Sequence, residues 1–159
     1  MMPNIKKIAV WGLGKHAISR ILPAISEVNG LRLVGVCSRK ESVVKECAEK
    51  MNCHGWTDPD DMLKEQDVDI IYLATPIGLH AKQGKSVLSA GKHLWCEKPF
   101  TCNLTESEEL IRLSRRNELT VAEGFMYLYH AQFKEIRKKV LTNKLGPIKE
   151  VSFKFGFPQ

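Results

Sequence analysis

Lys-Ile-Ala-Val-Trp-Gly-Leu-Gly-Lys-His-Ala, residues 7–17, passes from an apolar run through two glycines into a helical pattern. The spacing predicts a strand over Lys7–Trp11 and a helix over Lys15–Val28, with Pro23 as a kink or local break inside the helix. Between them stands the pattern G-x-G-x-x-A, in which small residues permit a tight turn, the approach of a backbone to a pyrophosphate, and close helix packing. Alone, this pattern fits a structural turn better than a binding site. After a strand, in a repeating strand-and-helix pattern, it strongly indicates a dinucleotide-binding loop made by Gly12, Leu13, Gly14, Lys15, His16 and Ala17.

The alternation of short β-branched runs with helical stretches continues to residue 123. Further strands are expected at Leu31–Cys37, Cys53–Trp56, Asp69–Ala74, His93–Cys96 and Thr120–Glu123. Helices are expected over Ser42–Met51, from Asp58-Pro59 to about Lys64, over Gly78–Ala90, and from a capping box of Thr105 and Glu108 to about Asn117. The fold class predicted is α/β, a doubly wound parallel sheet of the Rossmann type, whose strand carboxyl ends share one edge.

The character of the chain changes after residue 123. A basic helix is expected over Ala131–Thr142. The alternation beyond it predicts an amphipathic strand through Val151, Phe153, Phe155 and Phe157, and such a strand needs a partner sheet. We therefore expect a dinucleotide-binding domain at 1–123, followed at 124–159 by a junction helix and the first strand of an incomplete second domain, inside which the sequence looks cut off.

Composition narrows the class of protein. With 159 residues, of which 43% are apolar, the chain can bury one good core. The apolar run near the N-terminus is far shorter than a signal or membrane-spanning segment, so we expect a cytoplasmic protein that engages no membrane. The five cysteines include no C-x-x-C pair, so no disulfide framework and no metal are expected. The net charge of +6 comes without aromatic interleaving or a nucleic-acid motif, which favours a solvated helix face over nucleic-acid binding.

The end of the second expected strand bears on the choice of cofactor. An acidic side chain normally meets the ribose 2′-hydroxyl there, but this chain has Ser38, Arg39 and Lys40. Ser38 can donate a hydrogen bond, and both cations can pair with a dianionic 2′-phosphate. These residues favour NADP(H), while NAD(H) stays possible because Glu41 is adjacent and the two cations could be ordinary loop residues.

Thr75 and Pro76 end the fourth expected strand, next to the point where the strand order reverses. Their backbone and the Thr75 hydroxyl could line the nicotinamide side of a cleft. His80 follows in the first turn of the next helix, where packing or capping is about as consistent with a histidine as ligand contact.

Lys98 ends the fifth expected strand, between Glu97 and Pro99. Its ammonium could stabilise negative charge on a substrate oxygen and serve in a proton relay. A Lys-Pro pair alone is more typical of a surface turn, but the flanking motifs favour the catalytic interpretation. Lys98 is therefore the catalytic candidate among these residues.

These motifs, in this order and spacing, resemble the Gfo/Idh/MocA family of NAD(P)-dependent oxidoreductases. They are Gly12–Ala17, Thr75-Pro76-x-x-x-His80, Ala90-Gly91-Lys92-His93 and Glu97-Lys98-Pro99, and the resemblance extends to Glu123–Tyr127 and Leu145–Ile148 at the domain junction. The resemblance implies a Rossmann domain joined to an α/β domain that binds substrate and often forms the oligomer interface. It also implies that Gly12, Gly14 and Ala17 cradle the pyrophosphate, that Ser38 and Arg39 read the ribose, and that the Lys98-Pro99 peptide is often cis. By the same resemblance, Glu97 and Lys98 are the catalytic candidates and face the nicotinamide and the substrate.

Two functions from different classes remain open from the sequence. One is the cofactor-binding part of an NADP(H)-dependent enzyme that transfers hydride to or from a sugar, polyol or dihydrodiol-type compound, as a homo-oligomer or with a substrate domain supplied in trans. The other is a non-catalytic module or truncated remnant that binds NADP(H) and engages a partner through its last strand. Glu97 and Lys98 favour the enzyme. The family's second catalytic motif, an acid and a histidine in the substrate domain, lies beyond the residues given, which favours the module.

Overall fold

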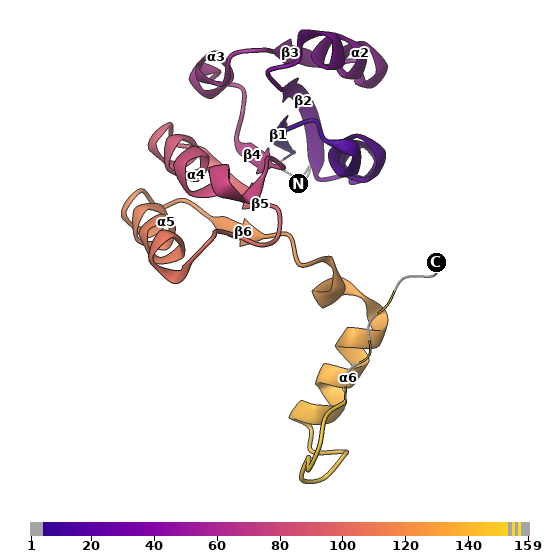
Figure 1. Ribbon diagram of the computed structural model, residues 1–159. Helices are drawn as coiled ribbons and strands as arrows, with labels where there is room; N and C mark the ends of the chain where they lie inside the picture. The colour runs from indigo at the N-terminus through magenta and orange to yellow at the C-terminus, as the bar shows by residue number, and fades with distance from the viewer. Residues whose placement is uncertain (1–4, 153, 155, 157–159) are drawn as a thin grey trace. The chain divides into compact units, whose positions relative to one another are not determined.

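The computed structural model describes residues 5–152, 154 and 156, and its contacts divide the chain into two compact units, Met1–Gly124 and Phe125–Gln159. The first unit is built on a six-stranded sheet in the order β3-β2-β1-β4-β5-β6, with every neighbouring pair parallel (Figure 1). The strands are β1 Lys6–Trp11, β2 Leu31–Cys37, β3 His54–Trp56, β4 Ile70–Leu73, β5 His93–Cys96 and β6 Val121–Glu123. The predicted doubly wound parallel sheet is confirmed. Strand order reverses between β1 and β4, the position where open α/β sheets bind ligands.

The helices between the strands cover both faces of this sheet. They are η1 Ala17–Ile21, α1 Leu22–Ser26, α2 Glu41–Met51, α3 Pro59–Lys64, η2 Ile77–Leu79, α4 His80–Ser89 and α5 Leu104–Arg116. The first predicted helix changes type beside Pro23, since the π-helical η1 continues directly into an α-helical turn at Leu22 without interruption. Asp58 caps α3 as predicted, since its side chain accepts the Asp60 N–H at 2.9 Å.

The start of α5 corrects one prediction. The N-cap is Asn103, whose side chain accepts the Glu106 N–H at 3.0 Å, and the Glu106 carboxylate accepts the Cys102 N–H at 3.1 Å. The predicted pair of Thr105 and Glu108 lies two residues further along, inside the helix. Both pairs have the sequence pattern of a capping box, and the chain begins the helix at the earlier one.

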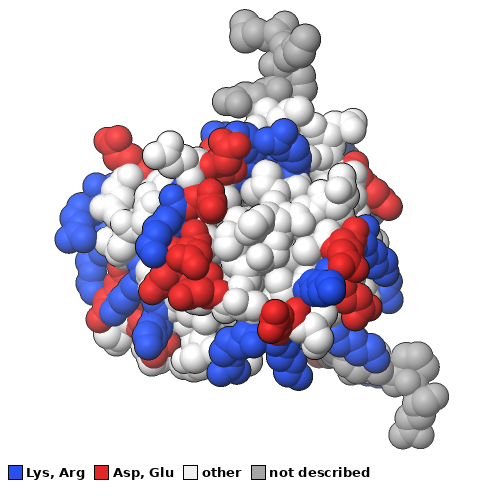
Figure 2. Space-filling view, turned by 90° about the horizontal axis from the view of Figure 1, so that it is seen from above, with Lys and Arg blue, Asp and Glu red and all other residues white. Residues whose placement is uncertain are grey.

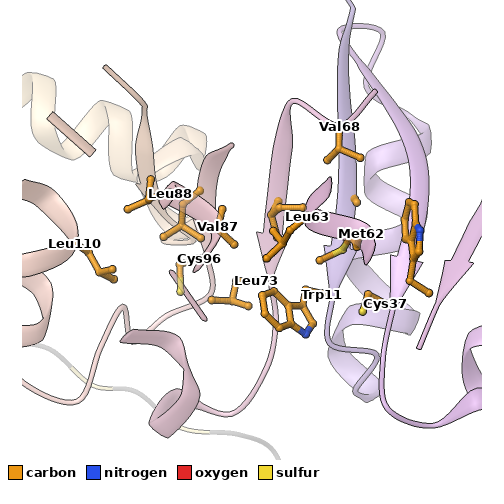
Figure 3. Packing of buried hydrophobic residues seen from close by; sticks show 14 residues of the cluster. Trp11, Cys37, Met62, Leu63, Val68, Leu73, Val87, Leu88, Cys96 and Leu110 are labelled. Atoms are coloured by element: carbon orange, nitrogen blue, oxygen red, sulfur yellow. The ribbon is translucent and has the colours of Figure 1, made fainter. Parts of the chain in front are cut away.

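The core of the first unit consists of two clusters of buried residues on opposite faces of the sheet. Ala9 and Trp11 of β1 point into the cluster that α3, α4 and α5 complete through Met62, Leu88 and Leu110 (Figure 3). The alternate β1 residues, Ile8 and Val10, belong to the cluster that η1, α1 and α2 complete, with Ala17, Leu22, Ile25 and Cys47. This alternation of side chains along a strand buried on both faces is the physical reason for the continuous apolar runs in the sequence.

The second unit contains η3 Met126–Tyr129 and α6 Ala131–Leu141, the latter capped by His130, whose Nδ1 accepts the Gln132 N–H at 3.2 Å. No described residue of this unit is buried. The predicted last strand is absent at Val151 and Ser152, whose backbone is irregular, and Phe153, Phe155 and Phe157 lie outside the described residues. Within the described part of this unit, no strand is present that could pair with Val151 and Ser152.

The surface carries both signs of charge. Figure 2 shows Lys and Arg side chains interspersed with Asp and Glu side chains over the visible face, so the positive charge there is not gathered into one patch. Over the residues that the structure describes, no helix has the length and apolar character needed to cross a membrane.

Candidate functional site

The loop after β1 is shaped by Gly12, whose φ of +106° lies in the left-handed region. Its N–H donates to the Cys37 carbonyl at 2.9 Å, so the loop is tied to the end of β2. A Cβ on Gly12 would lie 2.7 Å from the backbone carbonyl carbon and oxygen of Ala74, directly after β4. Gly12 is therefore required by the close packing of this turn against the next strand of the sheet.

Gly14 has the opposite surroundings. A Cβ built on it would meet nothing within 4 Å, so the space over this residue is open. Its carbonyl accepts the Ile18 N–H at 3.0 Å, which begins the helical turn, and Ala17 is buried behind the loop. A helix start beside open space presents free N–H groups and a partial positive charge, the combination that binds a phosphate group. Lys15 and His16 are exposed on the same turn, and Leu13 is partly buried.

The end of β2 lies beside this loop through the Gly12–Cys37 hydrogen bond. The Ser38 N–H donates to the Trp56 carbonyl at 3.2 Å, and its hydroxyl oxygen accepts the Lys40 N–H at 3.4 Å. Arg39 and Lys40 are exposed, and no carboxylate of the described residues lies within ion-pair distance of either. Two cations with no ion-pair partner among the described residues thus follow β2, the strand that neighbours β1 and its glycine loop.

The end of β4 is held by residues of the following helix. The Thr75 hydroxyl donates to the Gln83 side-chain oxygen at 2.5 Å, and the Thr75 carbonyl lies 2.7 Å from His80 Nε2. Thr75 is partly buried and Pro76 is exposed at the turn before η2. The sequence gives little signal for the role of Gln83, because a polar residue in a helix is ordinarily solvated.

His80 is buried, with 2% of its surface exposed, and both ring nitrogens face backbone carbonyls. Nδ1 lies 3.0 Å from the Pro99 oxygen and 3.2 Å from the Phe100 oxygen. The ring therefore braces the turn after β4 against the loop that follows Lys98. Of the two roles open from the sequence, this arrangement favours packing over ligand contact.

Lys98 itself is exposed at the end of β5, and the Lys98-Pro99 peptide is cis, as the resemblance implied. The next residue, Phe100, donates its N–H to the Glu123 carboxylate at 2.8 Å. The Lys98 side chain thus emerges from a loop whose backbone is fixed by His80 on one side and by Glu123, at the end of β6, on the other. Glu123 was predicted as the last residue of a strand and the first of the domain junction, but not as a partner of this loop.

Glu97 is buried immediately before this loop, with 9% of its surface exposed. The Tyr72 hydroxyl donates to its Oε1, its Oε2 accepts the Lys98 N–H at 3.2 Å, and His16 Nε2 lies 3.3 Å from Oε1. Burial and this hydrogen bond to Glu97 raise the pKa of Tyr72 well above its usual range, so the phenol stays protonated. Tyr72 was not predicted as a site residue because an aromatic residue in an apolar strand reads as core.

The structure therefore gathers the predicted residues at the carboxyl ends of neighbouring strands. The glycine loop meets Ala74 and Thr75, His16 meets Glu97, and the loop is bonded to Cys37, the residue before Ser38, Arg39 and Lys40. Among the described residues, no group of three or more His, Cys, Asp or Glu side chains is arranged to hold a metal ion.

Comparison with known proteins gives a consistent result. Residues 6–125 match the oxidoreductase family with an NAD-binding Rossmann fold known as Gfo/Idh/MocA. The chain is 30% identical to a dTDP-3,4-didehydro-2,6-dideoxy-alpha-D-glucose 3-reductase from Saccharopolyspora spinosa, over 96% of this chain and 46% of that protein. It is 31% identical to an NADP(+)-dependent scyllo-inositol 2-dehydrogenase from Bacillus subtilis (strain 168), over 82% of this chain and 39% of that protein.

Among solved structures, a 3-ketoreductase from Actinomadura kijaniata in complex with TDP-benzene and NADP superposes with a TM-score of 0.83 and 28% identity, over 88% of this chain and 44% of that chain. The chain spans less than half the length of each of these three relatives. The match to residues 6–125 covers most of the chain, and the fold and the loop motifs agree with it. The chain belongs to the Gfo/Idh/MocA family of oxidoreductases.

Proposed function

We propose that this chain is the cofactor-binding part of an NADP(H)-dependent oxidoreductase that acts on a hydroxyl or carbonyl group of a sugar or polyol. The observation that carries the proposal is the open space over Gly14, together with Ser38, Arg39 and Lys40 at the end of the adjacent strand β2, where neither cation has an ion-pair partner among the described residues. A cradle without a Cβ fits a pyrophosphate, and unpaired cations at the end of β2 fit a ribose 2′-phosphate.

Each residue of the site has a role in this proposal. The N–H groups from Gly12 to Ala17 bind the pyrophosphate, while Leu13, Lys15 and His16 line the same loop. Ser38, Arg39 and Lys40 bind the 2′-phosphate, and Arg39 and Lys40 supply the charge that favours NADP(H) over NAD(H). Thr75 and Pro76 line the nicotinamide side, and His80 fixes that turn from behind.

The chemistry depends on Lys98. NADPH, when bound, supplies a hydride from the nicotinamide ring. The Lys98 ammonium stabilises the negative charge that develops on the substrate oxygen and donates a proton to it, in the direction of reduction. Glu97 fixes the backbone from which Lys98 emerges. The named activities of the relatives, reduction of a keto sugar and oxidation of an inositol, support a ring hydroxyl or ketone as the substrate group.

Partner and compartment belong to the same proposal. Exposed apolar side chains such as Met126, Tyr129 and Leu141 support association of the second unit with another copy of the chain, or with a substrate domain supplied in trans. The five free cysteines support a reducing, cytoplasmic compartment.

The test is a titration of the full chain with NADPH and with NADH, followed by cofactor fluorescence. Arg39→Ala should weaken NADPH binding by roughly tenfold or more, the value of a charge-assisted hydrogen bond, and leave NADH binding nearly unchanged. Lys50→Ala, which removes an exposed cation at the far end of α2, is the matched control and should change neither affinity. Equal affinity for both cofactors, unaffected by Arg39→Ala, would contradict the preference for NADP(H). Failure of the wild-type chain to bind either cofactor would contradict the function itself.

A further inference from the structure

The Glu97 carboxylate joins three neighbouring strands at the edge of the sheet where the site lies. In the order β1-β4-β5, His16 follows β1, Tyr72 belongs to β4, and Glu97 follows β5. The Tyr72 hydroxyl and His16 Nε2 both approach Oε1, the second at 3.3 Å. Glu97 is thus the point at which the cofactor loop, the middle strand and the Lys98 loop meet.

Each partner brings a different degree of rigidity to this contact. Tyr72 is buried, with 4% of its surface exposed, and its ring packs against Trp95 with 5.2 Å between ring centroids. His16, in contrast, keeps half of its side chain exposed on the glycine loop. Tyr72 therefore fixes the carboxylate from the sheet side, while His16 can respond to whatever occupies the loop.

The same carboxylate also bonds to the backbone of Lys98. Oε2 of Glu97 accepts the Lys98 N–H at 3.2 Å. A buried carboxylate that loses a polar partner is less well satisfied, so a change at His16 or Tyr72 alters the hydrogen bond that it accepts from Lys98. The glycine loop and the Lys98 loop are then not independent parts of the site.

We infer that His16 and Tyr72 are positioning residues that act through Glu97, and that the His16–Glu97 contact couples occupation of the Gly12–Ala17 loop by cofactor to the placement of Lys98. The inference rests on the proposed function, since it takes NADP(H) as the occupant of the loop. In this inference Glu97 anchors the backbone of Lys98. The exposed His16 has a function that its position in the glycine motif does not by itself predict.

A double-mutant cycle on NADPH affinity tests the coupling in the full chain. The variants are His16→Leu, which removes the imidazole that contacts Oε1, Glu97→Gln, which removes the carboxylate charge, and the pair together. His16→Leu should weaken NADPH binding by about fivefold, the upper value for a partly exposed polar contact with a carboxylate, and by less than about twofold when Glu97 is already Gln. His16→Gln, whose amide nitrogen can take the position of Nε2, should restore affinity to within about twofold of wild type.

Two further variants serve as controls for the double-mutant cycle. Tyr72→Phe keeps the buried ring and removes only the hydroxyl that fixes the Glu97 carboxylate. It replaces Glu97→Gln in the cycle if that variant disturbs the fold, and His16→Leu should then weaken NADPH binding less in the Tyr72→Phe background than in the wild type. His54→Leu changes another exposed histidine, on β3, and should leave NADPH affinity unchanged. The urea-unfolding midpoint of each variant shows whether the variant is folded when the affinity is measured.

The outcomes separate the inference from the function on which it rests. If the wild-type chain binds NADPH but the fold-changes in affinity of the two single variants multiply to that of the double variant, the coupling is overturned and the proposed function is not. The same holds if His16→Gln binds NADPH as weakly as His16→Leu. Absence of NADPH binding by the folded wild-type chain overturns both. Non-multiplying fold-changes with rescue by His16→Gln support the inference.

Discussion

At the scale of single residues, the two glycines of the loop have different roles, since Gly12 is required by packing and Gly14 leaves space open. Gly12→Ala places a Cβ 2.7 Å from the Ala74 backbone at a φ of +106°, so we expect the free energy of unfolding to fall by about 2 kcal/mol or more. Gly14→Ala meets nothing within 4 Å and should change that free energy by less than about 0.5 kcal/mol, yet weaken NADPH binding by filling the open space. Urea unfolding and NADPH titration of both variants measure this, and an equally destabilised Gly14→Ala would contradict it.

The cysteines allow a second prediction at this scale. Burial raises the pKa of Cys37 and of Cys96 to about 12 and that of Cys53 to about 11, and burial also raises the pKa of Cys47. A raised pKa keeps these thiols protonated at pH 8, and the thiolate is the reactive form. Cys102 is exposed.

We therefore expect iodoacetamide at pH 8 to label one thiol quickly in the native chain, that of Cys102. In urea all five thiols should be labelled, and mass spectrometry measures both results. A Cys102→Ser variant should show none. Fast labelling of Cys37 or Cys96 in the native protein would mean that the sheet opens more readily than its packing indicates.

Among the elements, α5 tests where a helix begins. Asn103 accepts the Glu106 N–H at 3.0 Å, so Asn103→Ala should lower the free energy of unfolding by about 1 kcal/mol. Thr105 is exposed within the helix, and Thr105→Ala should change it by less than about 0.5 kcal/mol. Urea unfolding of the two variants compares them directly. A larger loss from Thr105→Ala would support the capping pair expected from the sequence.

The same element shows what sequence reasoning can and cannot reach. The strands were predictable because a parallel strand buried on both faces is a continuous apolar run, and the glycine pattern placed the loop after β1. The capping pair was not, because two pairs with suitable residues stand two positions apart. The contacts of Tyr72 and Glu123 could not be predicted either, since each joins residues more than 20 positions apart in the chain. The contact of Gln83 with Thr75, eight residues away, was missed because a polar residue in a helix looks ordinary locally.

On the scale of the whole chain, stability and the proposed site lie in the same unit. Among the described residues, all six strands and both buried clusters fall within Met1–Gly124, and no described residue of Phe125–Gln159 is buried. Burial of apolar surface is the dominant favourable contribution to folding. The first unit should therefore hold nearly all the free energy of unfolding of the chain.

A chain of residues 1–124 should accordingly unfold in urea in one cooperative transition, with a free energy of unfolding within about 0.5 kcal/mol of that of the full chain. Its NADPH affinity should also match, because Gly12–Ala17, Ser38–Lys40, Thr75 and Lys98 all lie in the first unit. Circular dichroism through the transition and the NADPH titration measure the two quantities. A shorter chain that is folded yet binds NADPH much more weakly would show that residues beyond Gly124 contribute to the cofactor site, and a broad, non-cooperative transition would show that they contribute to the core.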